Sequence, residues 1–451
     1  MTDYDERSVT GTLPQLVDTG SVARTVFDAV AGFGPLQKYL DDPTVEEIWI
    51  KDPLTAMSGR CRGSICRCRR PRLRGSRQVV TGAPGLWRCF PGRVAGVLAF
   101  GLVLAACSGS APGVDASSGP SATTSASATT TATASAAVDA LLRERGFTGA
   151  VLVRRGGEVL VRRGYGQADG ALGSANTPST RFRIGSVTKQ FTAAAVLVLA
   201  ARGKVGLEDR ACRYLPRCPG AWSTISVRHL LTHQSGLPEF LDLPGFDAMR
   251  PSTPADTLAD LRRVPLDFAP GTSFSYSNSG YIALGLVIEQ ASGVDYETFL
   301  RDSFFAPLGM SDSGYEHSGD VATVGYRDPD HVADPLDMSV PFAAGGLFST
   351  VDDLARWDTT LAGDDILPQD QIAQLWKPEV TNTDVVGFAY GFGEYVGRVD
   401  GGRLVIHDGG INGFRSVLAR WPDEGHLVVL LSNHEDTPDL RALAQDVAAV
   451  E

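Results

Sequence analysis

A serine and a lysine three residues apart, Ser186 and Lys189, stand at the start of a long apolar stretch. On a helix, positions i and i+3 share a face, so the serine hydroxyl and the lysine amine can meet. A serine is a weak nucleophile until a neighbouring base takes its proton, and the free N–H groups of a helix start favour developing negative charge. The spacing therefore suits a nucleophile and its base within one helical turn. A serine cap followed by a surface lysine would give the same tetrapeptide.

Three further segments contain residue types that suit such a pair. Each is short, and each is compatible alone with ordinary packing, such as an aromatic ring beside a turn or a strand-end histidine bonded to backbone. The evidence for a functional site is their joint presence and their order along the chain. The segments are residues 229–237 (HLLTHQSGL), Tyr276-Ser277-Asn278 and His407-Asp408-Gly409.

In the order S-x-x-K, L-L-T-H-x-S-G-L, Y-x-N and H-x-G, these motifs resemble those of the serine β-lactamase and penicillin-binding superfamily over about residues 140–450. The nearest group contains class C β-lactamases, D-alanyl-D-alanine carboxypeptidases and related esterases. Residues 307–310 (PLGM) and 344–349 (AGGLFS) fit the same pattern. The resemblance implies a serine hydrolase that forms an acyl-enzyme and needs neither a cofactor nor a metal.

The resemblance also implies a role for each matching residue. Ser186 would attack the substrate carbonyl, and Lys189 would take its proton, directly or through Tyr276. The lysine pKa must fall for this, and two groups so close titrate as a coupled pair, which leaves the identity of the base open. Asn278 would hold the substrate amide and the lysine. The backbone N–H groups of Ser186 and Gly410 would form the oxyanion hole, at roughly 2.7–4 kcal/mol per donor.

The third motif departs from the β-lactamase pattern, in which a lysine usually occupies the position of His407. A lysine offers a permanent charge to a substrate carboxylate, whereas a histidine with an ordinary pKa near 6.5 is mostly neutral at pH 7. His407 and Gly409 are still expected to bind substrate. We expect a D-alanyl-D-alanine carboxypeptidase-like hydrolase of a small-molecule or peptidoglycan-derived amide or ester. The alternatives are an esterase, a weak class C-like β-lactamase, or a penicillin-binding lipoprotein that senses peptidoglycan without turnover.

Strands and helices both occur along residues 137–451, which predicts an α+β domain. Strands at both ends with helices between them predict one antiparallel sheet closed by the two termini, flanked by helices, with an inserted helical lobe. The expected strands are 151–153, 159–161, 403–407, 414–421 and 427–432. The expected helices are 187–202, 282–292, 296–305, about 438–449, and one that starts in the capping-box sequence at 349–353.

Cys212 and Cys218 bracket a short loop that contains proline. In an exported domain this spacing favours a local disulfide, although two buried free thiols fit the sequence as well. His229 and His233 stand four apart, as a metal-binding pair on a helix does, but no glutamate lies beside His229. No metal site is therefore assigned.

The formal net charge of −11 is unevenly distributed along the chain. Residues 1–55 sum to −6, residues 56–93 to +10, and the remainder to −15. Nucleic acids are bound by basic surfaces, so the acidic remainder is a poor candidate for such a partner. The domain is expected to be monomeric and to bind no nucleic acid.

Residues 93–107 resemble a bacterial lipoprotein signal: an uncharged apolar run at 94–106 follows Arg93, and its last residues, Leu-Ala-Ala, are followed directly by Cys107. The run is too short to span a bilayer but suits a signal-peptide core; a short buried helix is the alternative. Cys107 would carry the lipid, and the Ser/Thr/Ala-rich residues 108–136 would form a flexible linker. This predicts an exported protein held at the membrane surface by a lipid anchor.

Residues 1–92, which precede the signal segment, have a different character. Residues 32–53, within a fragment at 1–58, resemble the N-terminal region of bacterial secretion-system ATPases. No G-x-x-x-x-G-K-[ST] loop is present, so ATPase activity is not expected. Residues 59–92 are dense in Arg, Cys, Gly and Pro, which fits a basic tail or, as we prefer, translation outside the true reading frame.

Overall fold

The computed structural model describes residues 123–317, 320–363 and 366–450, together with the short strands β1 (Trp49–Ile50) and β2 (Val80–Thr81). The chain divides into two compact units, Met1–Val114 and Asp115–Glu451. In the first unit, β1 pairs in parallel with β2. Apart from these two strands, the expected fragment at 1–58, the irregular segment at 59–92 and the signal segment at 93–107 with Cys107 lie outside the described residues.

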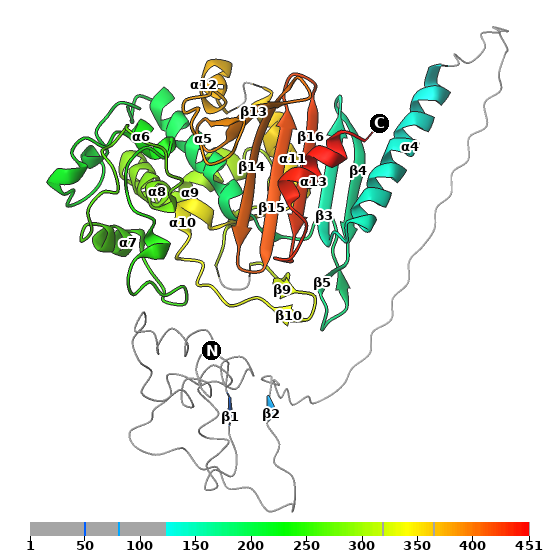
Figure 1. The fold of residues 1–451 in the computed structure, drawn as a ribbon, viewed down its shortest axis with the longest axis horizontal. Coiled ribbons are helices and arrows are strands. Elements are labelled where there is room, and N and C mark those ends of the chain that lie inside the picture. Colours follow the sequence, from blue (N-terminus) through cyan, green and yellow to red (C-terminus); the bar gives the residue numbers. More distant parts are fainter. Residues whose placement is uncertain (1–48, 51–79, 82–122, 318–319, 364–365, 451) are drawn as a thin grey trace, which may run out of the picture. The chain divides into compact units, whose positions relative to one another are not determined.

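A seven-stranded antiparallel sheet forms the centre of the second unit, in the order β12-β13-β14-β15-β16-β3-β4 (Figure 1). The strand β16, near the end of the chain, pairs with β3, near the start of the domain. The prediction of one sheet closed by both ends is confirmed. The strands are β3 (Gly149–Arg155), β4 (Glu158–Tyr165), β12 (Phe388–Tyr390), β13 (Tyr395–Val399), β14 (Gly402–Ile411), β15 (Phe414–Trp421) and β16 (His426–Ser432).

Two helices, α4 (Thr123–Glu144) and α13 (Leu440–Ala448), pack their apolar side chains into one core with sheet residues. Residues 123–136 are therefore helical, which differs from the flexible linker expected at 108–136, whose first part, 108–122, lies outside the described residues. Alanine has the highest helix propensity, and Ala134, Val138 and Leu142 recur at every fourth position, so they share one buried face. The alanine-rich stretch thus continues into the domain.

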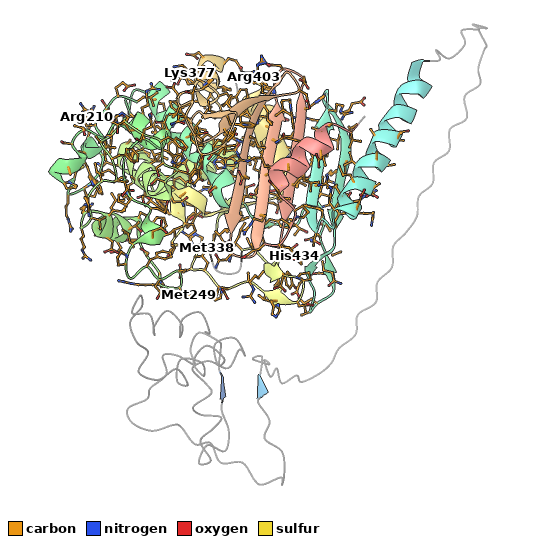
Figure 2. All side chains as sticks on the ribbon, in the orientation of Figure 1. Arg210, Met249, Met338, Lys377, Arg403 and His434 are labelled. Carbon is orange, nitrogen blue, oxygen red and sulfur yellow. A yellow bond between two sulfur atoms is a disulfide. The ribbon has the colours of Figure 1, made fainter. Side chains whose placement is uncertain are left out.

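A second core packs sheet residues against the helices of the expected lobe (Figure 1). The helix α5 (Thr188–Ala201) is buried from its first residue to Leu199, as its nearly unbroken apolar sequence predicts. Figure 2 shows the side chains of this unit on the same ribbon. The other helices of this part are α6 (Val227–Leu231), α7 (Pro254–Leu261), α8 (Asn278–Ser292), α9 (Tyr296–Leu300), α10 (Phe342–Gly345), α11 (Val351–Leu361) and α12 (Gln369–Leu375).

The helix predictions hold, with informative differences at the ends. The helix α8 begins at Asn278, earlier than expected, because the Ser277 side chain accepts from the backbone N–H of Gly280 and caps the first turn. The helix expected at 296–305 is α9 followed by one π turn, Arg301–Phe305. Thr350 caps α11 as the sequence predicts. Within the described residues, no helix combines the length and apolar character that a membrane span requires.

Short strands and one disulfide complete the described structure. Cys212 and Cys218 form a disulfide in the loop between α5 and α6, with Cα atoms 5.3 Å apart. A small sheet has the order β7-β11-β8, and its strand β7 comes directly before the turn that carries Ser186. The short strands are β5 (Gln167–Asp169), β6 (Ser174–Ala175), β7 (Phe182–Arg183), β8 (Gly314–Tyr315), β9 (Tyr326–Asp328), β10 (His331–Val332) and β11 (Leu347–Ser349).

Candidate active site

Ser186 lies in a single 3-10 turn, Gly185–Val187, that leads directly into α5. Gly185 has a φ of 47°, a left-handed conformation that glycine adopts without strain. This turn keeps Ser186 partly accessible while Lys189, one turn later, is fully buried. The Lys189 Nζ lies 3.0 Å from the Ser186 Oγ, so the two side chains meet as their spacing predicts.

The Lys189 amine has three hydrogen-bonding neighbours. Besides Ser186 Oγ, they are Asn278 Oδ1 at 2.7 Å and the Ala344 carbonyl oxygen at 2.9 Å. Burial lowers the pKa of Lys189 to about 7, against the opposing effect of the Glu239 and Asp408 carboxylates. A sizeable fraction of this amine is therefore neutral near pH 7.

A neutral amine matches these three neighbours. It has two N–H bonds, which can go to the oxygen of Asn278 and to the carbonyl of Ala344, because neither of these atoms can donate. Its lone pair is then free to accept from the Ser186 hydroxyl. The surroundings of Lys189 thus fit a base for that proton.

The ring of Tyr276 also lies beside the Lys189 amine, with Nζ 4.8 Å from the ring centroid. Burial raises the pKa of Tyr276 well above its ordinary value, and the nearby Ser186 side chain opposes this rise. The phenol therefore keeps its proton at neutral pH. Its hydroxyl oxygen is buried and has no hydrogen-bond partner among the described residues. Such a group can exchange a proton with a substrate atom placed beside it.

Glycines bring the strand β14 against the turn that carries Ser186. A Cβ on Gly409 would come within 2.2 Å of the Ile184 carbonyl oxygen, and one on Gly185 within 3.0 Å of the Gly410 nitrogen. Neither position leaves room for a side chain. This contact places the backbone of Gly410 and the backbone of Ser186 side by side, the two groups expected to stabilise an oxyanion.

His407 is buried and faces protein rather than solvent. Its Nδ1 lies 2.6 Å from the Asp408 carbonyl oxygen, which can only accept, so Nδ1 carries the proton. Its Nε2 accepts from the Tyr390 hydroxyl at 3.3 Å. Burial lowers the pKa of His407 to about 4, so the ring is neutral at physiological pH.

His407 and Gly409 were expected to bind substrate. A cavity of about 290 Å³ opens at Ser186, and neither of these two residues lines it. His407 is buried and accepts a hydrogen bond from Tyr390, and Gly409, within β14, packs against the backbone of Ile184 and Ser186. The polar part of the lining is Ser186, Asn278, Asn412 and the backbone of Gly185, Gly345 and Gly410; the rest is apolar or aromatic: Phe240, Leu241, Phe246, Ala248, Leu336, Val340, Pro341, Ala344 and Ile411.

His233 has a positional role that the sequence motif alone did not reveal. Its Nδ1 accepts from the Ser277 N–H at 3.0 Å, and its ring centroid lies 4.4 Å from that of Tyr276. His229, by contrast, accepts from the Ser226 N–H in the capping box of α6. The two histidines thus serve separate elements, and the described residues contain no cluster of three potential metal ligands.

Glu239 is a second residue that sequence reasoning missed. Its Oε2 accepts from the Asn278 N–H at 2.7 Å, at the start of α8. Burial raises the pKa of Glu239 above its ordinary value, although the carboxylate remains close enough to Lys189 to raise the pKa of that amine. Asp408, the other carboxylate with this effect, is ion-paired with Arg441. Glu239 has no ion-pair partner among the described residues.

Replacing Glu239 with glutamine should move the acid limb of the kcat/KM profile to lower pH. The amide keeps an acceptor for the Asn278 N–H but removes the negative charge that favours protonated Lys189, so the lysine pKa falls by about one unit or less. The profile is measured with a neutral ester. Glu208→Gln, the same change at an exposed site, should leave the profile in place, and an unmoved or upward-shifted limb in Glu239→Gln would contradict this electrostatic role.

Known proteins are similar to this chain in sequence. A family model described as Beta-lactamase matches residues 134–451. Penicillin-binding protein 4* of Bacillus subtilis (strain 168) is 29% identical over 314 residues, which cover 64% of this chain and 69% of that protein. Esterase EstB of Burkholderia gladioli is 32% identical over 272 residues, covering 49% of this chain and 67% of the esterase. The chain thus spans about two thirds of the length of these relatives.

Solved structures share the fold of this domain. The D-amino acid amidase from Ochrobactrum anthropi SV3 complexed with D-phenylalanine superimposes with a TM-score of 0.63 at 25% identity, covering 70% of this chain and 98% of the amidase. The penicillin-binding protein homologue from Pyrococcus abyssi superimposes with a TM-score of 0.61 at 27% identity, covering 70% of this chain and 76% of that one.

Proposed function

The chain belongs to the beta-lactamase family, whose members are serine hydrolases, over residues 134–451, and we propose that it cleaves an ester or amide bond through an acyl-enzyme on Ser186. The observation that carries the proposal is the 3.0 Å contact between Ser186 Oγ and a buried Lys189 amine whose pKa is about 7. A lysine of ordinary pKa would be protonated at neutral pH and could not act as a base.

In the acylation step, neutral Lys189 takes the hydroxyl proton as the Ser186 oxygen attacks the substrate carbonyl. The developing oxyanion is stabilised by the backbone N–H groups of Ser186 and Gly410. As the bond to the leaving group breaks, Tyr276 gives its proton to that group and regains one from the Lys189 ammonium. The high pKa of the Tyr276 phenol supports this order, with the lysine as the resident base.

In the deacylation step, water enters beside the acyl carbon and loses a proton to the neutral Lys189 amine, with Tyr276 as the relay. The hydroxide oxygen adds to the carbonyl carbon, and the bond to Ser186 Oγ breaks. The proton returns from the lysine to Ser186, which restores the free enzyme with release of the acid. Asn278 keeps the amine in place through both steps, because its oxygen accepts from Nζ.

Esters and amides without a carboxylate beside the scissile bond are the substrates that this site supports best. His407 is neutral and buried, so it offers no positive charge to a substrate carboxylate. The cavity beside Ser186 is mostly apolar. The 32% identity with an esterase and the 25% identity with a D-amino acid amidase agree with this choice. D-alanyl-D-alanine carboxypeptidase activity is the second candidate, supported by the relationship to penicillin-binding protein 4*.

A substrate panel tests this proposal. A neutral p-nitrophenyl ester should be hydrolysed with a higher kcat/KM than a D-Ala-D-Ala peptide or a chromogenic cephalosporin. Product release should continue after the first turnover. A stoichiometric burst with no steady state would instead favour the penicillin-binding sensor, and a preference for the peptide would favour the carboxypeptidase.

Replacing His407 with lysine should raise kcat/KM for the carboxylate-bearing substrates relative to the neutral ester, because the new side chain adds a positive charge behind the cavity. The measured quantity is the ratio of the two kcat/KM values, so a partial loss of folded protein cancels. His407→Gln, which stays neutral, and His331→Lys, which adds the charge at an exposed position, should leave the ratio unchanged. If His407→Lys has the same ratio as the wild type, our interpretation that the neutral His407 disfavours carboxylate-bearing substrates is wrong.

A further inference from the structure

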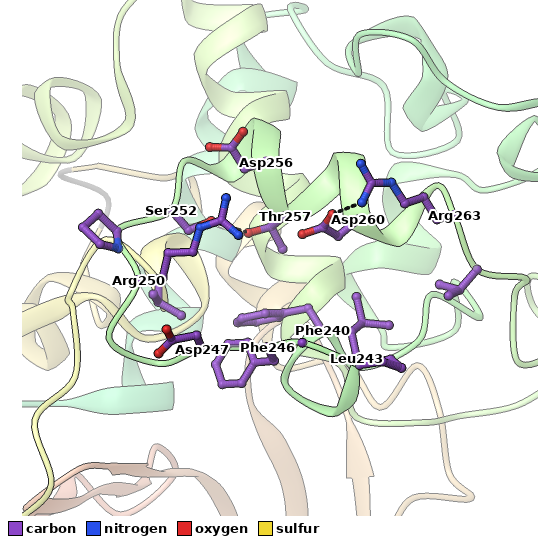
Figure 3. A pocket seen from close by; sticks show the side chains of 15 residues that line it. Phe240, Leu243, Phe246, Asp247, Arg250, Ser252, Asp256, Thr257, Asp260 and Arg263 are labelled. Carbon is purple, nitrogen blue, oxygen red and sulfur yellow. Dashed lines mark hydrogen bonds and ion pairs between the residues drawn. The ribbon is translucent and has the colours of Figure 1, made fainter. Parts of the chain in front are cut away.

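A second cavity, of about 390 Å³, lies in the helical lobe between α7 and the loop at 243–253 (Figure 3). Three of its lining side chains, Phe240, Phe246 and Val340, also line the cavity at Ser186. The two spaces therefore adjoin, with these side chains as their common wall. No step of the proposed hydrolysis uses the second cavity.

The second cavity has an apolar side and a charged side. In Figure 3, Phe240, Leu243 and Phe246 lie together on one side, opposite Asp256, Asp260 and the arginines. An apolar group that enters along the aromatic side would be stabilised because its surface is removed from water. The charged side would then meet the far end of that group.

Most of the charges on this side already have partners. Asp260 pairs with Arg263 at 3.0 Å, and Asp256 accepts from the backbone N–H and the hydroxyl of Thr253 at the start of α7. Asp247 lies beside Phe246 in Figure 3, on the apolar side, and accepts from the Met249 N–H at 2.9 Å. These carboxylates are occupied within the protein.

Arg250 differs from these groups in its hydrogen bonding. Its guanidinium makes no ion pair within 4 Å and no side-chain hydrogen bond with any described residue, although its charge helps to lower the pKa of the Asp256 carboxylate. In Figure 3 the side chain extends over the cavity toward Ser252 and Thr257. A guanidinium in this position presents several N–H donors to a planar anion such as a carboxylate.

From this arrangement we infer that the second cavity is a distal acyl-binding subsite, which receives the far end of a substrate whose carbonyl lies at Ser186. The preferred acyl group has an apolar segment that passes Phe246 and ends in a carboxylate bound by Arg250. Phe246 is half-buried and belongs to a loop rather than to a helix or strand, so its side chain can turn aside. This inference rests on the proposed acyl-enzyme mechanism.

The terminal charge is tested with p-nitrophenyl esters of acetate, octanoate, suberate (as the monoester) and 8-aminooctanoate. The suberate monoester should exceed octanoate in kcat/KM by about tenfold, as expected for one charge-assisted contact. Arg250→Gln should bring this ratio close to one and leave acetate hydrolysis unchanged. Arg263→Gln, on the same side but paired with Asp260, should keep the ratio. An unchanged ratio in Arg250→Gln, or a preference for the aminooctanoate ester, would overturn the inference.

The apolar segment is tested by filling the second cavity alone. Val264 lines this cavity and not the one at Ser186, so Val264→Trp should lower kcat/KM for octanoate and suberate esters by about tenfold but not for acetate. Phe246→Ala should have the opposite effect on the long esters. Equal effects of Val264→Trp on all esters would overturn the subsite. Acetate ester hydrolysis that is absent, or unaffected by Ser186→Ala, would contradict the acyl-enzyme proposal instead.

Discussion

Replacing Ser186 with alanine should abolish covalent labelling by a fluorophosphonate and lower kcat/KM for a neutral ester by about five to six orders of magnitude, as loss of a serine nucleophile does elsewhere. Among the hydroxyl side chains of the described residues, Ser186 alone combines a hydrogen bond to the Lys189 amine with a position in the lining of the cavity. Among the residues that the structure describes, no second serine makes a hydrogen bond to this lysine.

The labelled peptide should be identified by mass spectrometry after digestion of the wild-type protein. Ser275→Ala provides the matched control, because Ser275 is exposed and adjacent in sequence to Tyr276. It should retain both labelling and hydrolysis. Thermal unfolding of Ser186→Ala should stay close to that of the wild type, since the serine is only partly buried. Labelling that persists in Ser186→Ala would refute the assignment of the nucleophile.

Replacing Lys189 with methionine should lower kcat/KM by roughly two to four orders of magnitude, the usual contribution of a positioned base. Methionine has a similar length but no lone pair that can take the Ser186 proton. The wild-type kcat/KM should fall on the acid side of about pH 7, where the amine becomes protonated. The residual activity of the variant should lack this limb. A variant that keeps both the rate and the limb would exclude Lys189 as the base.

Lys189→Met should also change how stability depends on pH, which tests the burial of the lysine independently of its role in catalysis. In the folded protein the pKa of Lys189 is about 7, against 10.5 in an exposed lysine, so between these values the unfolded chain binds the proton more strongly. The wild-type free energy of unfolding should therefore rise with pH from about 7 toward 10.5 through this residue and should not change through it below 7. The contribution is absent in Lys189→Met.

Urea unfolding at pH 7 and pH 9.5 measures this contribution as a difference between proteins. The wild type should gain stability relative to Lys189→Met at the higher pH. An exposed lysine supplies the control, because Lys204→Met should give a curve parallel to the wild type. Parallel curves for wild type and Lys189→Met would show that the amine is not desolvated in the folded protein.

Much of the site could be predicted because its parts lie in short segments. The contact between Ser186 and Lys189 follows from helical spacing alone. The order of strands and helices likewise predicted the sheet closed by both ends, since apolar periodicity determines the type of each element. The resemblance of the motifs then supplied Tyr276 and Asn278, whose closeness to the lysine no local pattern reveals.

What could not be predicted depends on tertiary burial. A histidine at the end of an apolar strand gives no indication that it will be buried, hydrogen-bonded to Tyr390 and absent from the lining of the cavity. Glu239 follows a recognisable motif, yet its contact with the Asn278 N–H joins residues 39 positions apart. The start of α4 was missed for a simpler reason. A Ser/Thr/Ala-rich sequence suits a linker, and only the packing of Val138 and Leu142 shows where the helix becomes part of the domain.

The pairing of β16 with β3 also constrains how the domain can fold. The two strands are separated by most of the domain, so their contact requires a very long loop to close, and such contacts slow folding. During synthesis, β3 emerges early but cannot obtain its partner until residues 426–432 have left the ribosome. Until then one edge of the β3–β4 hairpin exposes unpaired backbone groups, which favours association with other chains. Thus β16, the last strand of the sheet to be made, covers the open edge of β3, the first strand of that sheet.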